Sequence, residues 1–113
     1  QHIDAPIQPP AAFATWTLRQ DQPAGSSRAS GWDTPSGNYS SAGHYMSARS
    51  FGHTGYTGTS IWIDPVNDVV IVLLTNRVNP TRNTPKFGQI RGVVADAVMQ
   101  SLLPGLAPRA FVP

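Results

Sequence analysis

The chain has 113 residues, 40% of them hydrophobic and 12% charged, which fits one small domain or part of one and excludes a highly charged disordered tail. Its net charge of +2 comes from scattered basic residues, so we expect no nucleic-acid partner, and its longest apolar run is too short to span a membrane. The absence of cysteine excludes disulfides, thiolate metal sites and a cysteine nucleophile.

Residues 1–36 are the least regular part of the sequence, because prolines and a polar stretch interrupt them. One short helix is expected within residues 11–19, directly after a proline, which fits the first turn of a helix. Residues 38–50 are rich in serine, glycine and tyrosine and predict a long surface loop. We therefore expect an irregular segment over residues 1–36 and an organised part over residues 37–113. Because the sequence opens on Gln1 rather than Met, we also expect a piece of a longer protein.

Three extended segments are predicted between residues 51 and 74. Residues 51–54 and 57–63 are expected to be strands, the second because Ile61 and Ile63 alternate with Trp62. Asp64 and Pro65 then open a turn with the residues that type I geometry favours. The uninterrupted apolar run over residues 69–74 predicts a strand that is covered on both faces, in the middle of a sheet.

A helix is predicted after the strands, with Thr84 as its N-cap, Pro85 as its first residue and Pro104-Gly105 beyond its end. Its expected apolar stripe consists of Phe87, Ile90, Val94, Ala97, Val98, Ser101 and Leu102. The predicted fold class is α/β (α+β), an antiparallel three-stranded sheet with a C-terminal helix packed on it. The second face of this sheet needs a cover that the sequence does not supply.

Single polar residues are weak indicators of function in this sequence. A lone histidine such as His53 is more often structural than catalytic, and Asp64 and Asp68 are better explained as turn residues than as a carboxylate pair. The histidine spacing fits no metal motif, so we expect no metal and no cofactor.

A combination of two motifs is more informative. The segment from His53 reads H-T-G-Y-T-G-T at the start of a strand, and residues 76–82 read N-R-V-N-P-T-R directly after the return strand. In an antiparallel pair, Asn76 should lie at the same sheet end as residues 52–56. Amide and guanidinium donors at that end would suit a carboxylate.

This combination resembles the C-terminal end of class C β-lactamases, DD-peptidases and related serine esterases, which belong with the penicillin-binding proteins. The resemblance extends from about Gly31 to Leu103, with an extension towards Phe13, and would cover only the last quarter or third of a family protein. It implies a partial β-lactamase/transpeptidase-like fold and a single, incomplete domain. It also implies a whole protein that cleaves a β-lactam, a D-Ala peptide or an ester through an acyl-serine intermediate.

The resemblance also implies roles for individual residues. His53 would act electrostatically, although an ordinary imidazole is only about a quarter protonated at pH 7. The backbone N–H of Tyr56 would be one of two oxyanion donors. Thr54 would bind a substrate carboxylate, and Gly55 would leave room for the substrate beside the strand. The candidate substrate-binding residues are Thr54, Gly55, Asn76, Asn79 and Arg82.

Two motifs of the family, S-x-x-K and Y-x-N, are absent from the sequence. The nucleophile and its base would therefore lie outside this chain, and we expect the chain alone to be inactive. Its expected partners are the missing N-terminal part or another copy, and a small-molecule or peptide substrate. The resemblance favours a periplasmic or secreted location. Two alternatives remain open: a non-catalytic binding or scaffolding relative, and an autonomous small α/β binding domain.

Overall fold

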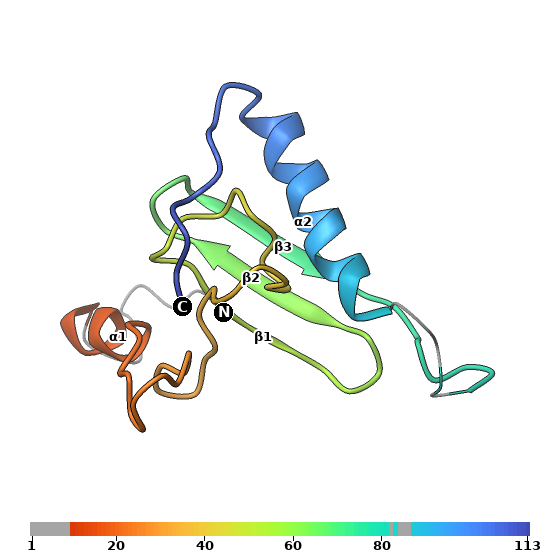
Figure 1. Ribbon diagram of the computed structural model, residues 1–113, viewed down its shortest axis with the longest axis horizontal. Helices are drawn as coiled ribbons and strands as arrows, with labels where there is room; N and C mark the ends of the chain where they lie inside the picture. Colours follow the sequence, from red (N-terminus) through yellow and green to blue (C-terminus); the bar gives the residue numbers. More distant parts are fainter. Residues whose placement is uncertain (1–9, 82, 84–86) are drawn as a thin grey trace, which may run out of the picture.

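The computed structural model describes residues 10–81, 83 and 87–113 (Figure 1). Its elements in chain order are α1 (Pro10–Trp16), β1 (Phe51–Thr54), β2 (Ser60–Asp64), β3 (Val69–Leu73) and α2 (Phe87–Leu102). The three strands form one antiparallel sheet in the order β1-β2-β3, which confirms the predicted fold class. Figure 1 shows α2 crossing the sheet and α1 lying to one side, away from α2. The predicted cap residues Thr84 and Pro85 lie outside the described residues.

The register of the sheet extends beyond its three strands. Trp62 pairs with Gly52 on one side and with Ile71 on the other. Isolated bridges continue this row outwards from β1, from Gly52 to Asp33 and from Asp33 to Arg28. A side chain on Gly52 would collide with the Ile61 carbonyl and the Trp62 ring, so glycine is required where β1 crosses this indole. The segment around residue 33 is thereby fixed beside the outer edge of β1.

The hydrophobic core lies between one face of the sheet, α2 and residues 42–46. Trp62 and Ile71 supply the sheet side of this core, and Ala42 and Met46 are fully buried against them. Residues 38–50 form an irregular loop as expected, but the expectation that this loop lies on the surface was wrong for Ala42, Met46 and Ser50, which are buried. Its serine and glycine content indicated exposure, but Gly43 adopts φ 71° and brings the chain close to α2. A side chain at Gly43 would meet the carboxylate of Asp96.

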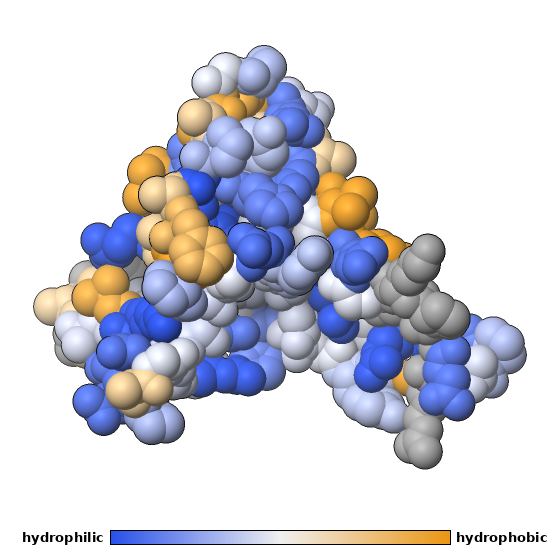
Figure 2. All heavy atoms as spheres, in the orientation of Figure 1, coloured by the Kyte–Doolittle hydropathy of each residue, from blue (hydrophilic) through white to orange (hydrophobic). Residues whose placement is uncertain are grey.

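The buried face of α2 differs from the predicted stripe. Ala95 and Met99 are buried, whereas Ile90 and Leu102 are 42% and 59% exposed. The reason is steric: a Cβ on Gly92 would lie 2.9 Å from the Ser40 carbonyl oxygen, so the helix approaches through its small residues. In Figure 2, apolar side chains accordingly show at the surface beside α2.

The second face of the sheet is only partly covered within the described residues. Phe13 of α1 and Trp32 pack edge-on against Phe51, with ring centroids 5.9 and 5.1 Å from it. Val70 and Val72 on the same face remain 59% and 56% exposed. The prediction of a central strand covered on both faces was therefore wrong for the described chain, because α2 covers β3 from one side and β3 is an edge strand.

Candidate active site

The H-T-G-Y segment lies where β1 ends and the chain turns towards β2. His53 and Thr54 are the last two residues of β1, and both are exposed. Gly55 opens the turn by donating its N–H to the Thr59 carbonyl at 2.8 Å. A Cβ on Gly55 would collide with the Thr59 hydroxyl, so the Thr59 side chain would have to move to admit one. The predicted role of Gly55 against a substrate stays a prediction.

Two arginines hold the carbonyl groups of this turn. Arg91, from α2, donates from Nη2 to the Gly55 carbonyl at 2.8 Å. Arg77 donates from Nε to the Tyr56 carbonyl, and its guanidinium carbon lies 4.8 Å from the centre of the Tyr56 ring. Burial, reinforced by the neighbouring charge of Arg77, lowers the pKa of Arg91 from its ordinary value. The sequence had placed Arg77 in the N-R-V-N-P-T-R motif without a contact of its own, and had shown Arg91 only as one of a scattered basic set.

The chain after β3 completes the support of the turn. Arg77 donates its backbone N–H to the Thr57 carbonyl at 2.8 Å, and the Thr75 hydroxyl donates to the Gly58 carbonyl at the same distance. These bonds confirm that the segment after β3 lies beside the end of β1. Every carbonyl from Gly55 to Gly58 thus accepts a hydrogen bond. Among the described residues, no partner is recorded for the N–H of Tyr56, so a rigid turn presents an unused donor.

The predicted carboxylate-binding residues are less well defined. Asn76 and Asn79 are both exposed. The Asn76 side-chain oxygen accepts a hydrogen bond from the Val78 N–H at 3.2 Å, which closes its own turn. Arg82 lies outside the described residues. The contribution of Asn76, Asn79 and Arg82 to substrate binding stays a prediction.

His53 contacts a residue that sequence reasoning missed. Its Nε2 lies 2.9 Å from Nη1 of Arg28, and its Nδ1 lies 2.7 Å from the Thr54 carbonyl oxygen. No motif spacing links Arg28 to His53, because the contact arises from the bridges that attach residues 28 and 33 to β1. At the end of β1, Arg28 therefore contacts the imidazole of His53. Arg77 and Arg91 contact the turn that follows.

Comparison with known proteins assigns the chain to a family. The model of the family described as Beta-lactamase matches residues 8–95. The chain belongs to the beta-lactamase family. This confirms the resemblance to serine β-lactamases and penicillin-binding proteins, and places the chain in a family of serine hydrolases.

Curated relatives are similar over part of the chain. A protein of Escherichia coli (strain K12) named "Putative D-alanyl-D-alanine carboxypeptidase" is 39% identical over 71 residues, covering 53% of this chain and 16% of that protein. A protein of the same name from Salmonella newport (strain SL254) is 48% identical over 44 residues, covering 39% of this chain and 10% of that protein. The chain thus spans a small fraction of the length of these relatives. No solved structure is significantly similar to it.

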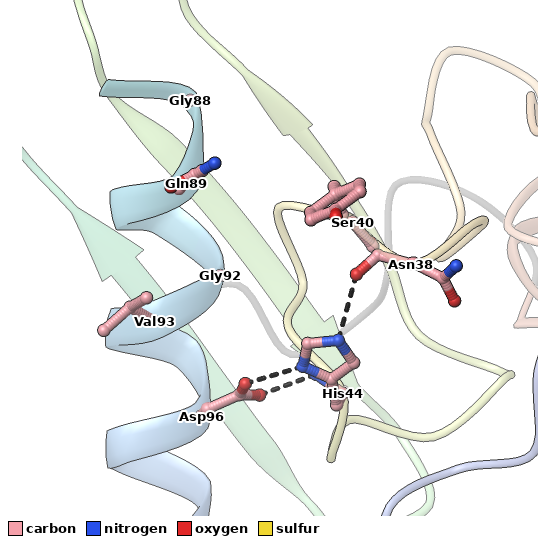
Figure 3. A pocket seen from close by; sticks show the side chains of 9 residues that line it. Asn38, Ser40, His44, Gly88, Gln89, Gly92, Val93 and Asp96 are labelled. Atoms are coloured by element: carbon pink, nitrogen blue, oxygen red, sulfur yellow. Dashed lines mark hydrogen bonds and ion pairs between the residues drawn. The ribbon is translucent and has the colours of Figure 1, made fainter. Parts of the chain in front are cut away.

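A pocket of about 240 Å³ in this beta-lactamase-family chain lies between the loop after residue 37 and the first turns of α2 (Figure 3). None of the predicted site residues lines it. Figure 3 shows His44 between Asp96 and the Asn38 carbonyl, with Nδ1 2.9 Å from the Asp96 carboxylate and Nε2 3.0 Å from that carbonyl oxygen. Both neighbours are acceptors, so only a doubly protonated ring can satisfy them together. His44 therefore joins the loop to α2, and both of its contacts favour the charged form of the ring.

We predict that these two hydrogen bonds of His44 make the free energy of unfolding depend on pH. The hydrogen bond to Asp96 and then the bond to Asn38 raise the pKa of His44, against smaller opposing effects of burial and of Arg109. A raised pKa means that the stabilisation is fully present below about pH 6.5 and is lost as pH rises through the folded-state value. The ring is largely exposed, so His44→Gln should remove about 1 kcal/mol or less at pH 5.5 and nothing at pH 9. Urea unfolding at both pH values tests this, and an equal loss at both would contradict it.

The described residues contain no group of three or more histidine or acidic side chains arranged to hold a metal ion. In the same part of the chain, neither helix is long and apolar enough to cross a membrane.

Proposed function

We propose that the chain is the C-terminal part of a serine hydrolase that cleaves an amide or ester bond through an acyl-serine intermediate. The observation that carries this proposal is the rigid turn after His53 and Thr54, whose carbonyls are all bound while the Tyr56 N–H is unused. The family match and the names of the relatives support the same reaction class. The proposed substrates are a β-lactam, a peptide ending in D-Ala, or an ester.

The proposed chemistry uses the turn as half of an oxyanion hole. Attack by a serine on a carbonyl carbon moves negative charge onto the carbonyl oxygen, and donors already aimed at that position lower the barrier. The N–H of Tyr56 is one such donor, and the second comes from the nucleophile in the remainder of the protein. The Thr54 hydroxyl, one residue past His53 and exposed, donates to a substrate carboxylate in this scheme.

We propose that the nucleophile-bearing part covers the sheet face that carries His53. His53 pairs with Ile61, and Ile61 pairs with Val72, so the pleat places these three residues on one face. The exposure of Val70 and Val72 leaves a row of apolar surface on that face beside the imidazole. A covering segment would bury this row and bring a serine to the end of β1. The remainder of the same protein is the proposed covering partner, and another copy of the chain is the alternative.

The proposal predicts covalent labelling of the whole protein but not of this segment alone. The full-length protein should form a stoichiometric adduct on one serine with a labelled penicillin or with a fluorophosphonate probe, detected by mass spectrometry and peptide mapping. The chain of 113 residues, which lacks S-x-x-K, serves as the control and should stay unlabelled. If neither reagent modifies a serine of the full-length protein, it is not an acyl-serine hydrolase. Labelling of a serine within these 113 residues would also contradict the proposal.

A further inference from the structure

We propose that Arg28 is a positioning residue for His53, which it holds as the neutral Nδ1–H tautomer while placing a permanent positive charge beside the ring. The contact joins Nη1 of Arg28 to Nε2 of His53 at 2.9 Å. Its meaning for catalysis rests on the proposed hydrolase function, whereas the tautomer follows from the geometry of the described chain.

The tautomer follows from which atoms can donate. A guanidinium has five N–H donors and no acceptor, so Nε2 of His53 must accept the hydrogen bond from Arg28. Nδ1 then carries the ring proton and donates it to the Thr54 carbonyl oxygen at 2.7 Å. The two contacts require the same tautomer. A proton on Nε2 would make it a donor facing the N–H donor of Arg28. Protonation of Nε2 therefore requires Arg28 to move away.

The backbone around Arg28 fixes its position beside the end of β1. Its carbonyl accepts a hydrogen bond from the Gln20 N–H at 3.0 Å, and its own N–H donates to the Ser26 hydroxyl at 3.2 Å. Arg28 bridges to Asp33, which exchanges backbone hydrogen bonds of 2.7 and 2.9 Å with Gly52, the residue before His53. The long and flexible side chain of Arg28 is thus attached two strand positions out from β1, with Asp33 between them, and reaches the ring of His53 from there.

Arg28 forms no ion pair with Asp33, the acidic residue to which its backbone bridges. The Asp33 carboxylate accepts from the Ser27 hydroxyl at 2.6 Å and from the Thr34 N–H at 2.9 Å. Within the described part of the chain, the recorded ion pairs are Arg19 with Asp21 and His44 with Asp96, so none involves Arg28. The Asp33 carboxylate is therefore hydrogen-bonded within its own turn rather than to the guanidinium of Arg28.

This arrangement changes how the site obtains its positive charge. An ordinary imidazole carries only about a quarter of a charge at pH 7, and that charge disappears as pH rises. An arginine side chain stays charged throughout this range. In the proposed hydrolase, Arg28 supplies a charge that does not depend on pH, and His53 is a neutral hydrogen-bonding group oriented by it.

¹⁵N NMR of the ring nitrogens of the three histidines tests this assignment directly. The chain of 113 residues is labelled at histidine and recorded near pH 8.5, where an ordinary imidazole is about 99% neutral. The His53→Gln variant assigns the signals. We expect His53 to show a protonated Nδ1 and a bare Nε2. In Arg28→Met, which removes every donor to Nε2, the fraction of the Nδ1–H tautomer should fall, although the Thr54 carbonyl still favours it, while Arg28→Lys should retain the original pattern.

Arg49→Met is the matched control, because Arg49 is also exposed and its replacement removes the same charge. It should leave the His53 signals unchanged. The proposal is overturned if wild-type His53 carries its proton on Nε2 or on both nitrogens, or if Arg28→Met leaves the tautomer unchanged. The amide spectrum of each variant verifies that it is folded, and the wild-type pattern alone can already contradict the proposal.

A kinetic measurement connects the tautomer to the reaction. In the full-length protein, Arg28→Met should lower the rate of serine acylation by at least about tenfold, and Arg28→Lys should recover part of the loss. If the full-length protein forms no adduct while the NMR result holds, the hydrolase function fails and the positioning of His53 stands. If the adduct forms but the tautomer does not depend on Arg28, the inference fails and the hydrolase function stands.

Discussion

Asp64→Asn is expected to lower the free energy of unfolding by about 3 kcal/mol, because it disrupts a buried carboxylate with five donors. Asp64 is fully buried and accepts hydrogen bonds from the N–H and hydroxyl of Ser47 at 2.8 and 2.6 Å. The Asn67 amide donates to it at 2.7 Å, and the N–H groups of Val66 and Asn67 donate at 3.0 and 3.2 Å. Asparagine keeps the shape but sets an NH₂ group against these donors. Urea unfolding followed by circular dichroism measures the loss.

Asp68→Asn is the matched control, since it makes the same chemical change at the other end of the same turn. Asp68 is exposed and adopts φ 57°, a conformation that asparagine also tolerates. Its replacement should change the free energy of unfolding by no more than about 0.5 kcal/mol. Equal losses in the two variants would show that the hydrogen bonds of Asp64 do not hold the turn to residue 47.

The same carboxylate makes the chain sensitive to acid. Burial alone would raise the pKa of Asp64, but the hydrogen bonds from Ser47 and Asn67 outweigh burial, so the folded-state pKa lies below its ordinary value. An unfolded aspartate titrates near pH 3.9. The stabilisation is therefore present above about pH 4 and is lost as pH falls through the lower folded-state value. Asp64→Asn should remove this part of the acid dependence.

The sheet and the helix could be predicted because local patterns specify them. Alternation around Trp62, the Asp64-Pro65 turn and the apolar run of β3 indicate strands whatever surrounds them. The burial of part of residues 38–50 could not be predicted from such local patterns. Ala42 is buried because Gly43 and Gly92 let two segments far apart in the sequence approach closely, and hydrophobic periodicity contains no information about such a contact.

In the candidate site, too, features specified by a local motif could be predicted, whereas contacts made by tertiary structure could not. The H-T-G-Y motif indicated where the strand ends, and the structure confirms that the chain after β3 returns there. Arg77 belongs to the quoted N-R-V-N-P-T-R motif, but its contacts were not predicted, and Arg28 and Arg91 were not predicted at all. Arg28 reaches His53 through isolated bridges, and Arg91 reaches Gly55 from α2, so both contacts depend on tertiary structure rather than spacing. The scattered basic residues of the sequence thus include three that converge at one sheet end.

Removing the single N–H of Tyr56 is expected to lower the acylation rate of the full-length protein by about 10²–10³-fold, the effect of losing one oxyanion donor. The change is made by incorporating the α-hydroxy acid analogue of tyrosine at position 56, which turns the amide into an ester and keeps the side chain. Stopped-flow acylation with a chromogenic β-lactam or an activated ester gives the rate. Because the charge on the oxygen develops only in the transition state, the dissociation constant of the substrate should change much less than the rate.

The ester also weakens the Gly55 carbonyl as an acceptor for Arg91, so a control must separate this effect from the loss of the donor. The analogous ester at Thr57 weakens the Tyr56 carbonyl, which accepts from Arg77, and removes an N–H that has no proposed role. Tyr56→Phe keeps both the N–H and the ring. Both controls should stay within a few-fold of the wild-type rate. If the ester at Thr57 is as slow as the ester at Tyr56, the rate depends on the arginine support of the turn, and the N–H of Tyr56 is not the oxyanion donor.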